Sequence, residues 1–167
     1  MIKVGILTVS DRSFTNHRPD LSGPALVDFV DSLNWEVVAT RIVPDELDQI
    51  SSTLIEWTDS GKINLILTTG GTGFSPRDIT PEATLKVVQR LAPGLAEVMR
   101  FTSLQKTPHA MLTRSICGIR DLTIIINLPG NPNAAVENLQ SIQSVLPHAI
   151  ELLLGSADSE SHHNFNK

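Results

Sequence analysis

A glycine-rich segment followed by a carboxylate is the part of this sequence best suited to chemistry. It reads Gly70-Gly71-Thr72-Gly73, with Asp78 after it and Thr80-Pro81-Glu82 next. Glycines let a backbone approach a ligand closely and turn its amides toward an anion. Thr80 as a cap, Pro81 and Glu82 predict a helix start, whose free amides also favour anions. Asp78 would repel a bare phosphate, so we expect a divalent cation to join the two.

Two better-known phosphate motifs do not fit this segment. A P-loop needs a lysine and then a serine or threonine after its last glycine, and this chain has Phe74 and Ser75 there. The dinucleotide fingerprint needs a third glycine and usually follows the first strand, and the segment 71–76 meets neither condition. The alternative is that the glycines only form a tight connection, with Asp78 as a solvated loop residue.

Composition favours a globular domain and argues against several kinds of partner. The chain has 167 residues, of which 41% are hydrophobic and 19% charged, and its net charge is −5. Nucleic-acid surfaces need clustered Lys and Arg, and base-stacking platforms need aromatic side chains, which make up only 4% here. No apolar run has the length of a membrane span. We therefore expect neither a nucleic acid nor a membrane as partner.

Cys117 is the single cysteine. It can form no disulfide within the chain, which is typical of a reducing compartment and predicts a cytoplasmic protein. Its surroundings in 115–119 are largely apolar, so it is expected to be a small buried hydrophobe. The histidines lack zinc-site spacing and no Gly-x-Ser-x-Gly elbow is present. The sequence therefore predicts neither zinc chemistry nor a hydrolytic triad.

The hydrophobic pattern predicts strands that alternate with helices. Expected strands cover 3–10, 35–43, 63–68, 111–119 and 122–128. Expected helices begin near Ser22, which would cap the first of them, and near Asp45, Pro81, Pro93 and Asn131. The third should cover 81–91, and Pro147 should kink or break the last one, which reaches about 154.

This order of elements predicts an α/β fold, a three-layer sandwich. A mostly parallel sheet would carry helices on both faces, and the last two strands would form a small antiparallel hairpin toward one edge. We expect one domain over residues 1–155 and a disordered tail over 156–167.

Four polar loops leave the carboxyl ends of the expected strands, where ligands bind in open α/β sheets. These loops would bring Asp11, Asp45 and Asp78 to one rim, and Mg²⁺ is often held by one or two carboxylates together with substrate phosphates. The loops are Ser10-Asp11-Arg12, Pro44-Asp45-Glu46, the 70–78 segment, and Pro129-Gly130-Asn131-Pro132.

Structural roles for the same side chains stay open. Asp45 could simply cap its helix, Asp78 could hold Arg77 or a loop amide, and Asp11 could cap a turn. Four cations could either help to bind phosphates or be solvated at the surface; they are Arg12, Arg77, Lys106 and Arg114.

Three segments, 5–11, 68–83 and 124–134, resemble the molybdopterin adenylyltransferase family. This family includes bacterial stand-alone enzymes and the G domains of gephyrin and of the plant molybdenum-cofactor protein. The most specific match is the block Gly-Gly-Thr-Gly-x-x-Pro-Arg-Asp-x-Thr-Pro-Glu, and the resemblance covers about residues 3–154.

The resemblance implies a reaction in which the terminal phosphate of molybdopterin attacks the α-phosphorus of ATP and pyrophosphate leaves. Such chemistry needs alignment and charge neutralisation more than covalent help. Asp45 and Asp78 match the essential acids that orient Mg²⁺ and the nucleotide phosphates, while Ser103 and Ser115 match serines near the pterin. The other substrate-binding residues expected from the rim loops are Ser10, Asp11, Gly70, Gly71, Thr72, Gly73, Pro129, Gly130 and Asn131.

Two other classes of function stay open, namely a molybdopterin carrier without catalysis and a scaffold. The presence of both Asp45 and Asp78 favours the enzyme over the carrier, and the lack of a long extension disfavours the scaffold. The resemblance also implies a homotrimer and a partner that could be the molybdate-insertion enzyme.

Overall fold

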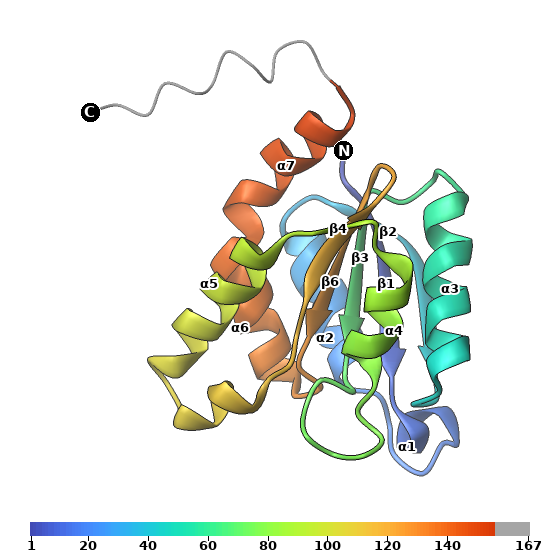
Figure 1. Cartoon of the computed structure of the whole chain (residues 1–167), viewed down its shortest axis with the longest axis vertical. Helices are drawn as coiled ribbons and strands as arrows, with labels where there is room; N and C mark the ends of the chain where they lie inside the picture. Colours follow the sequence, from blue (N-terminus) through green and yellow to red (C-terminus); the bar gives the residue numbers. More distant parts are fainter. Residues whose placement is uncertain (156–167) are drawn as a thin grey trace.

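One six-stranded sheet forms the centre of the protein in the computed structural model, which describes residues 1–155 (Figure 1). Its strand order is β2-β1-β3-β6-β5-β4. The first four strands in this order are parallel: β2 (Glu36–Val43), β1 (Lys3–Val9), β3 (Leu65–Thr69) and β6 (Thr123–Leu128). The last two are antiparallel at one edge: β5 (Cys117–Arg120) and β4 (Arg90–Leu91).

Helices cover both faces of this sheet. One face carries α2 (Ser22–Ser32), α5 (Pro93–Leu104), α6 (Pro132–Ile142) and α7 (Leu146–Leu153), and the other carries α3 (Leu47–Asp59) and α4 (Thr80–Val87). The short elements are α1 (Asp11–Phe14) and the 3₁₀ helices η1 (Pro108–Leu112) and η2 (Gln143–Val145). The predicted three-layer α/β architecture with an antiparallel hairpin at an edge is therefore confirmed.

Each face of the sheet has its own core, because side chains alternate along a strand. In β3, Leu65 and Leu67 pack in the core under α2 and α6, whereas Ile66 packs in the core under α3 and α4. All three are fully buried. Burial on both faces explains why this strand reads as an unbroken apolar run in the sequence.

The prediction of a strand over 111–119 is wrong for most of that range. Residues 108–112 form η1, where Pro108 fixes the first backbone angle and the Thr107 hydroxyl accepts a hydrogen bond from the His109 amide. The strand itself begins only at Cys117. The turn chemistry of this proline therefore prevails over the apolar pattern that follows it.

The expected helix 81–91 is too long. The helix α4 ends at Val87, and Val88 is already extended. The amides of Gln89 and Ala92 then donate to the carbonyls of Ile119 and Cys117. Pairing with β5 therefore takes the last residues out of the helix and makes them strand β4.

Two expected helix caps belong to other residues. Ser22 is the first residue of α2, and its amide donates to Asp20 Oδ1 (3.0 Å). Thr80 is likewise inside α4, whose cap position is Ile79, and the Thr80 hydroxyl donates to the carbonyl of Gly70 (2.8 Å). The Thr80 side chain therefore ties the helix to the glycine-rich turn instead of capping the helix.

Two expectations for the last helical region are confirmed. Asn131 caps α6, because its side chain accepts a hydrogen bond from the amide of Ala134 (3.1 Å). The helix ends at Ile142, and Pro147 lies in the first turn of the separate helix α7. A proline fits there because an amide in the first turn has no partner within the helix.

None of the helices in residues 1–155 is long and apolar enough to cross a bilayer. The tail expected at 156–167 lies outside the described residues. The expected domain boundary at 155 therefore stays a prediction.

Candidate functional site

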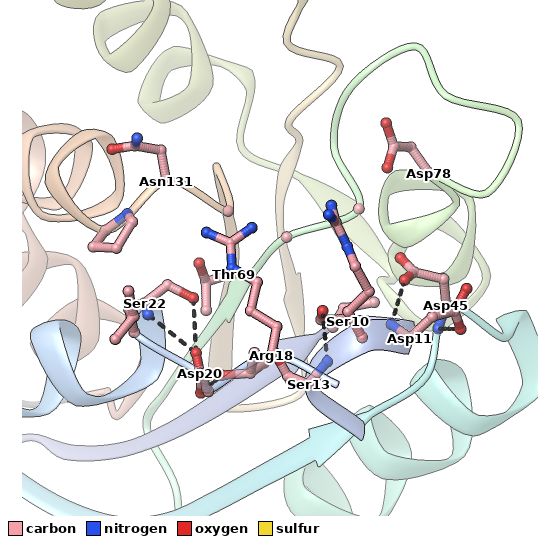
Figure 2. Close-up of a pocket in the computed structure, with 18 of the residues that line it drawn as sticks. Ser10, Asp11, Ser13, Arg18, Asp20, Ser22, Asp45, Thr69, Asp78 and Asn131 are labelled. Atoms are coloured by element: carbon pink, nitrogen blue, oxygen red, sulfur yellow. Dashed lines mark hydrogen bonds between the residues drawn. The ribbon is translucent and has the colours of Figure 1, made fainter. Parts of the chain in front are cut away.

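A pocket of about 660 Å³ lies at the carboxyl ends of β1 and β3, at the rim that the sequence predicts. Figure 2 shows Asp45, Asp11 and Asp78 on one side of the pocket, and Asp20, Ser22 and Asn131 on the other. Eight predicted site residues line it together: Ser10, Asp11, Asp45, Gly70, Gly71, Asp78, Gly130 and Asn131.

Five other predicted site residues do not line this pocket: Thr72, Gly73, Pro129, Ser103 and Ser115. Ser103 lies at the end of α5, where its hydroxyl accepts a hydrogen bond from Asn138 Nδ2. Ser115 is buried and shares a hydrogen bond with the Thr113 hydroxyl. The roles implied for these residues by the family resemblance stay predictions.

Asp11 and Asp45 hold each other's loops in place. The Asp11 amide donates to Asp45 Oδ2 (2.8 Å), and the Asp45 amide donates to Asp11 Oδ1 (3.0 Å). Glu46, rather than Asp45, occupies the cap position of α3. Asp45 therefore does not have the helix-capping role that the sequence left open, and its carboxylate is presented at the rim.

Arg77 bridges the glycine-rich segment to these loops. Its Nε and Nη2 donate to the two carboxylate oxygens of Asp11 (3.0 Å each), and Nη2 also donates to Glu46 Oε1 (2.8 Å). The hydrogen bonds from Arg77 are the main reason why the pKa of Asp11 is lowered. Asp11 is thus a neutralised carboxylate, and Arg77 does not pair with the neighbouring Asp78.

Asp45 is the least compensated carboxylate on this side. It is buried, and this burial is the main reason why its pKa is raised; the negative charges of Asp11 and Asp78 raise it further. Asp78 Oδ2 accepts a hydrogen bond from the Ser75 amide (3.0 Å). The carboxylates of Asp45 and Asp78 therefore place negative charge at the rim that the protein's own groups compensate only in part.

Gly71 brings the backbone close to these groups. Its φ is +63°, a conformation that side-chain-bearing residues rarely adopt. A Cβ at this position would collide with the Thr80 hydroxyl and lie 3.0 Å from Asp45 Oδ1. The glycine is thus required by both conformation and space, which fits a turn that approaches a ligand.

The donor set suits Mg²⁺ held jointly with a substrate. No group of three or more His, Cys, Asp or Glu side chains in residues 1–155 is placed to hold a metal. Mg²⁺, however, is usually bound by one or two carboxylates plus substrate phosphates and waters. Asp45 and Asp78 supply such oxygens, and a cation there would relieve the repulsion that raises the pKa of Asp45.

The side of the pocket around Asp20 escaped the sequence analysis. Asp20 Oδ1 accepts hydrogen bonds from the amides of Ser22 and Gly23 (3.0 Å each) and from the Ser22 hydroxyl (3.1 Å). Its Oδ2 accepts one from the Thr8 hydroxyl (2.6 Å). An Asp just before a helix start is a recognised capping signal, and it could have been found two residues before Ser22.

Comparison with known proteins identifies the family. A family model described as "Probable molybdopterin binding domain" matches residues 5–148. The chain belongs to this family. The matched range includes both carboxylates, Asp45 and Asp78, and the glycine-rich turn between β3 and α4.

Individual relatives agree with this assignment. The chain is 43% identical to the molybdopterin adenylyltransferase of Helicobacter pylori strain J99, over 93% of this chain and 89% of the relative. It superposes on the molybdopterin biosynthesis enzyme MoaB of Thermus thermophilus with a TM-score of 0.88 and 47% identity, over 93% of this chain and 98% of that one.

Another relative is much longer. The chain is 42% identical to the molybdenum cofactor synthesis protein cinnamon of Drosophila melanogaster, over 91% of its own length. It spans only 26% of the cinnamon chain.

Proposed function

We propose that this protein is a molybdopterin adenylyltransferase that acts in the synthesis of the molybdenum cofactor. The observation that carries the proposal is that Asp45 and Asp78 both line the pocket at the strand ends, close enough for the charge of Asp78 to raise the pKa of the buried Asp45 further. Several relatives that share 37–43% identity over most of the chain bear this enzyme's name.

In the proposed reaction, an oxygen of molybdopterin's terminal phosphate attacks the α-phosphorus of ATP. A new P–O bond forms at the α-phosphorus. The bond between the α-phosphorus and the oxygen that bridges the α- and β-phosphates breaks, and its electron pair leaves with pyrophosphate. Asp45 and Asp78 would hold Mg²⁺, which when bound neutralises the charge of the phosphates. The chain's contribution is alignment and electrostatics, as in phosphoryl transfer generally.

Individual groups at the rim have separate parts in this proposal. The positive φ of Gly71 brings backbone close to the phosphates. Arg77 neutralises Asp11, which keeps a third negative charge away from the reacting anions. Asn131 and the start of α6 add a helix N-terminus at the opposite side of the pocket, where an anionic group of either substrate is favoured.

The direct test is to incubate the purified protein with molybdopterin and Mg·ATP and to measure both released pyrophosphate and adenylylated molybdopterin. We expect the two products in equal amounts, and neither when EDTA removes the divalent ion or when molybdopterin is left out. Tight molybdopterin binding without pyrophosphate would instead favour the carrier function.

A homotrimer and a cytoplasmic location are parts of the same proposal. The trimer rests on the family resemblance, and sedimentation equilibrium would test it.

The location rests on Cys117 being the single cysteine, because no disulfide can then form within the chain, as is typical of a reducing compartment. Cys117 is buried, and burial raises its pKa to about 12, so the thiol is an inert part of the core. Transfer of the product to the molybdate-insertion enzyme would be tested by co-sedimentation of the two proteins.

A further inference from the structure

Arg114 makes an unusual set of contacts although it does not line the pocket. It lies in the segment between η1 and β5. Its Nε donates to the carbonyl of Gly73 (2.7 Å), and its Nη2 donates to the carbonyl of Asp78. One guanidinium therefore binds both the beginning and the end of the 73–78 loop.

Two further bonds fix Arg114 itself. Its Nη1 forms an ion pair with Glu82 in the first turn of α4, and its backbone amide donates to the carbonyl of Thr72 (2.8 Å). The planar guanidinium offers donors in a rigid fork, which a lysine cannot reproduce. The contacts therefore connect the loop, the helix that follows it and the segment before β5 through one side chain.

The loop has few other ties to the rest of the protein. Its middle residues, 74–77, are exposed. Within it, the Asp78 amide donates to the Ser75 carbonyl, and the Ser75 amide donates to Asp78 Oδ2. The other side chain that anchors it is Arg77, whose ion pairs with Asp11 and Glu46 are exposed and so weakened by solvent and salt.

We infer that Arg114 is a positioning residue, which holds the glycine-rich loop so that Asp78 stays opposite Asp45. It does not itself line the pocket, and acts through the backbone carbonyl of Asp78, which does. Partners that orient a metal-binding group typically change metal affinity or activity by about 10–100-fold when they are mutated. The catalytic half of this inference rests on the proposed function, whereas the structural half does not.

The test compares two variants of this residue with a matched control. Arg114→Met removes the guanidinium, and Arg114→Lys keeps the charge but replaces the fork, whose Nε and Nη2 bond the two carbonyls, by a single nitrogen. Arg120→Met is the control, because Arg120 also bonds a carboxylate, that of Asp59, and a backbone carbonyl, that of Val87, but neither partner belongs to the 73–78 loop or to the pocket lining.

Four measurements are made on each full-length protein: the melting temperature, hydrogen–deuterium exchange of the 72–78 amides, calorimetric titration with Mg·ATP, and kcat and KM for adenylyl transfer. We expect both Arg114 variants to exchange at least about tenfold faster in 72–78 and to bind Mg·ATP at least about fivefold more weakly. We expect kcat to fall by roughly tenfold, about 1.4 kcal/mol. Arg120→Met should lower the melting temperature without these effects.

Each outcome has a definite reading. Unchanged exchange in 72–78 would overturn the inference outright, as would faster exchange with unchanged Mg·ATP affinity and kcat, because Arg114 would then be only a structural tie. If the wild-type protein releases no pyrophosphate, the proposed function fails, but exchange and Mg·ATP affinity still decide the role of Arg114. If Arg114→Met does not fold, Arg114→Lys carries the test.

Discussion

One aspartate from each side of the pocket, Asp20 and Asp45, shows how differently the protein surrounds its carboxylates. Asp20 accepts four hydrogen bonds, three on Oδ1 and one on Oδ2, and two of them come from the first two amides of α2. Asp45 accepts one from the Asp11 amide, lies buried and is repelled by Asp11 and Asp78, so its pKa is raised.

This difference separates a structural carboxylate from one reserved for a ligand. The protein's own donors already use the oxygens of Asp20, so its charge stabilises the fold. Asp45 instead costs stability as long as nothing positive lies beside it. Perturbed carboxylates of this kind in a cleft are typical of functional sites, and the predictions below test whether the distinction holds.

The largest expected effect is a loss of adenylyl transfer when Asp78, on the same side of the pocket as Asp45, is changed to Asn. Asp78→Asn keeps an oxygen that can accept the hydrogen bond from the Ser75 amide and removes only the charge. We expect a loss of adenylyl transfer of at least about 100-fold, or about 2.7 kcal/mol, with a melting temperature close to wild type. Steady-state pyrophosphate release and thermal melting of the same preparation check this. A variant that turns over within about threefold of wild type, about 0.65 kcal/mol, would show that Asp78 is no metal ligand.

The next effect is on stability at the Asp20 side. Asp20→Ala removes the side-chain acceptor of the first two amides of α2, a capping interaction, and leaves the Thr8 hydroxyl, which is buried, without its acceptor. Loss of a cap costs about 1 kcal/mol and an unpaired buried hydroxyl about 1–3 kcal/mol. Because 1 kcal/mol is about 2–4 °C for a domain of this size, we expect a fall in melting temperature of at least about 4 °C. No measurable fall would remove the contrast between the two aspartates.

The sequence predicts the fold well where one residue pattern decides the structure. The β3 run, whose side chains are buried in the two cores, and the helix start at Asn131 are examples. It fails where distant partners decide, as at Gln89 and Ala92, whose amides pair with β5 instead of continuing α4. No local pattern encodes that partner.

The candidate site shows the same limit. Asp45 and Asp78 can be found because carboxylates at the ends of parallel strands must meet at one rim. The bonds from Arg114 to the carbonyls of Gly73 and Asp78 cannot be found in this way. They join a loop to a segment far along the chain through backbone oxygens, which every residue carries.

A smaller effect is expected at Gly71, where comparison with Gly61 separates the cost of backbone strain from an effect on ligand binding. Gly71 and Gly61 have nearly the same positive φ, +63° and +65°, but a Cβ at Gly61 would meet nothing within 4 Å. Substitution to alanine should cost about 1–2 kcal/mol at either position through the backbone alone. Only Gly71→Ala should also weaken Mg·ATP binding, because its Cβ crowds Thr80 and Asp45. Calorimetric titration of both variants decides, and equal affinities would make the turn purely structural.

The smallest expected effect is a rise in melting temperature for Asp45→Asn, whereas Asp20→Ala should lower it. Burial raises the pKa of Asp45 in the folded protein, so the ionised carboxylate costs stability at neutral pH. Asp45→Asn removes this charge and keeps an oxygen that can accept from the Asp11 amide. We therefore expect the variant to melt a few degrees above wild type at pH 7 in EDTA, where no divalent cation compensates the wild-type charge.

The pH dependence of this gain identifies its cause. A raised folded-state pKa means that wild type loses the penalty when Asp45 becomes protonated, so the advantage of Asp45→Asn should shrink as pH falls from neutral toward about 4, the ordinary range of an aspartate. The hydrogen bonds from Arg77, the main cause of the lowered pKa of Asp11, are present in both proteins, so their contribution to the pH dependence cancels in the difference. Millimolar Mg²⁺ should raise the melting temperature of wild type more than that of the variant. If the difference in melting temperature between Asp45→Asn and wild type stays constant across pH, the gain comes from packing. Asp45 would then be no better suited than Asp20 to bind a ligand.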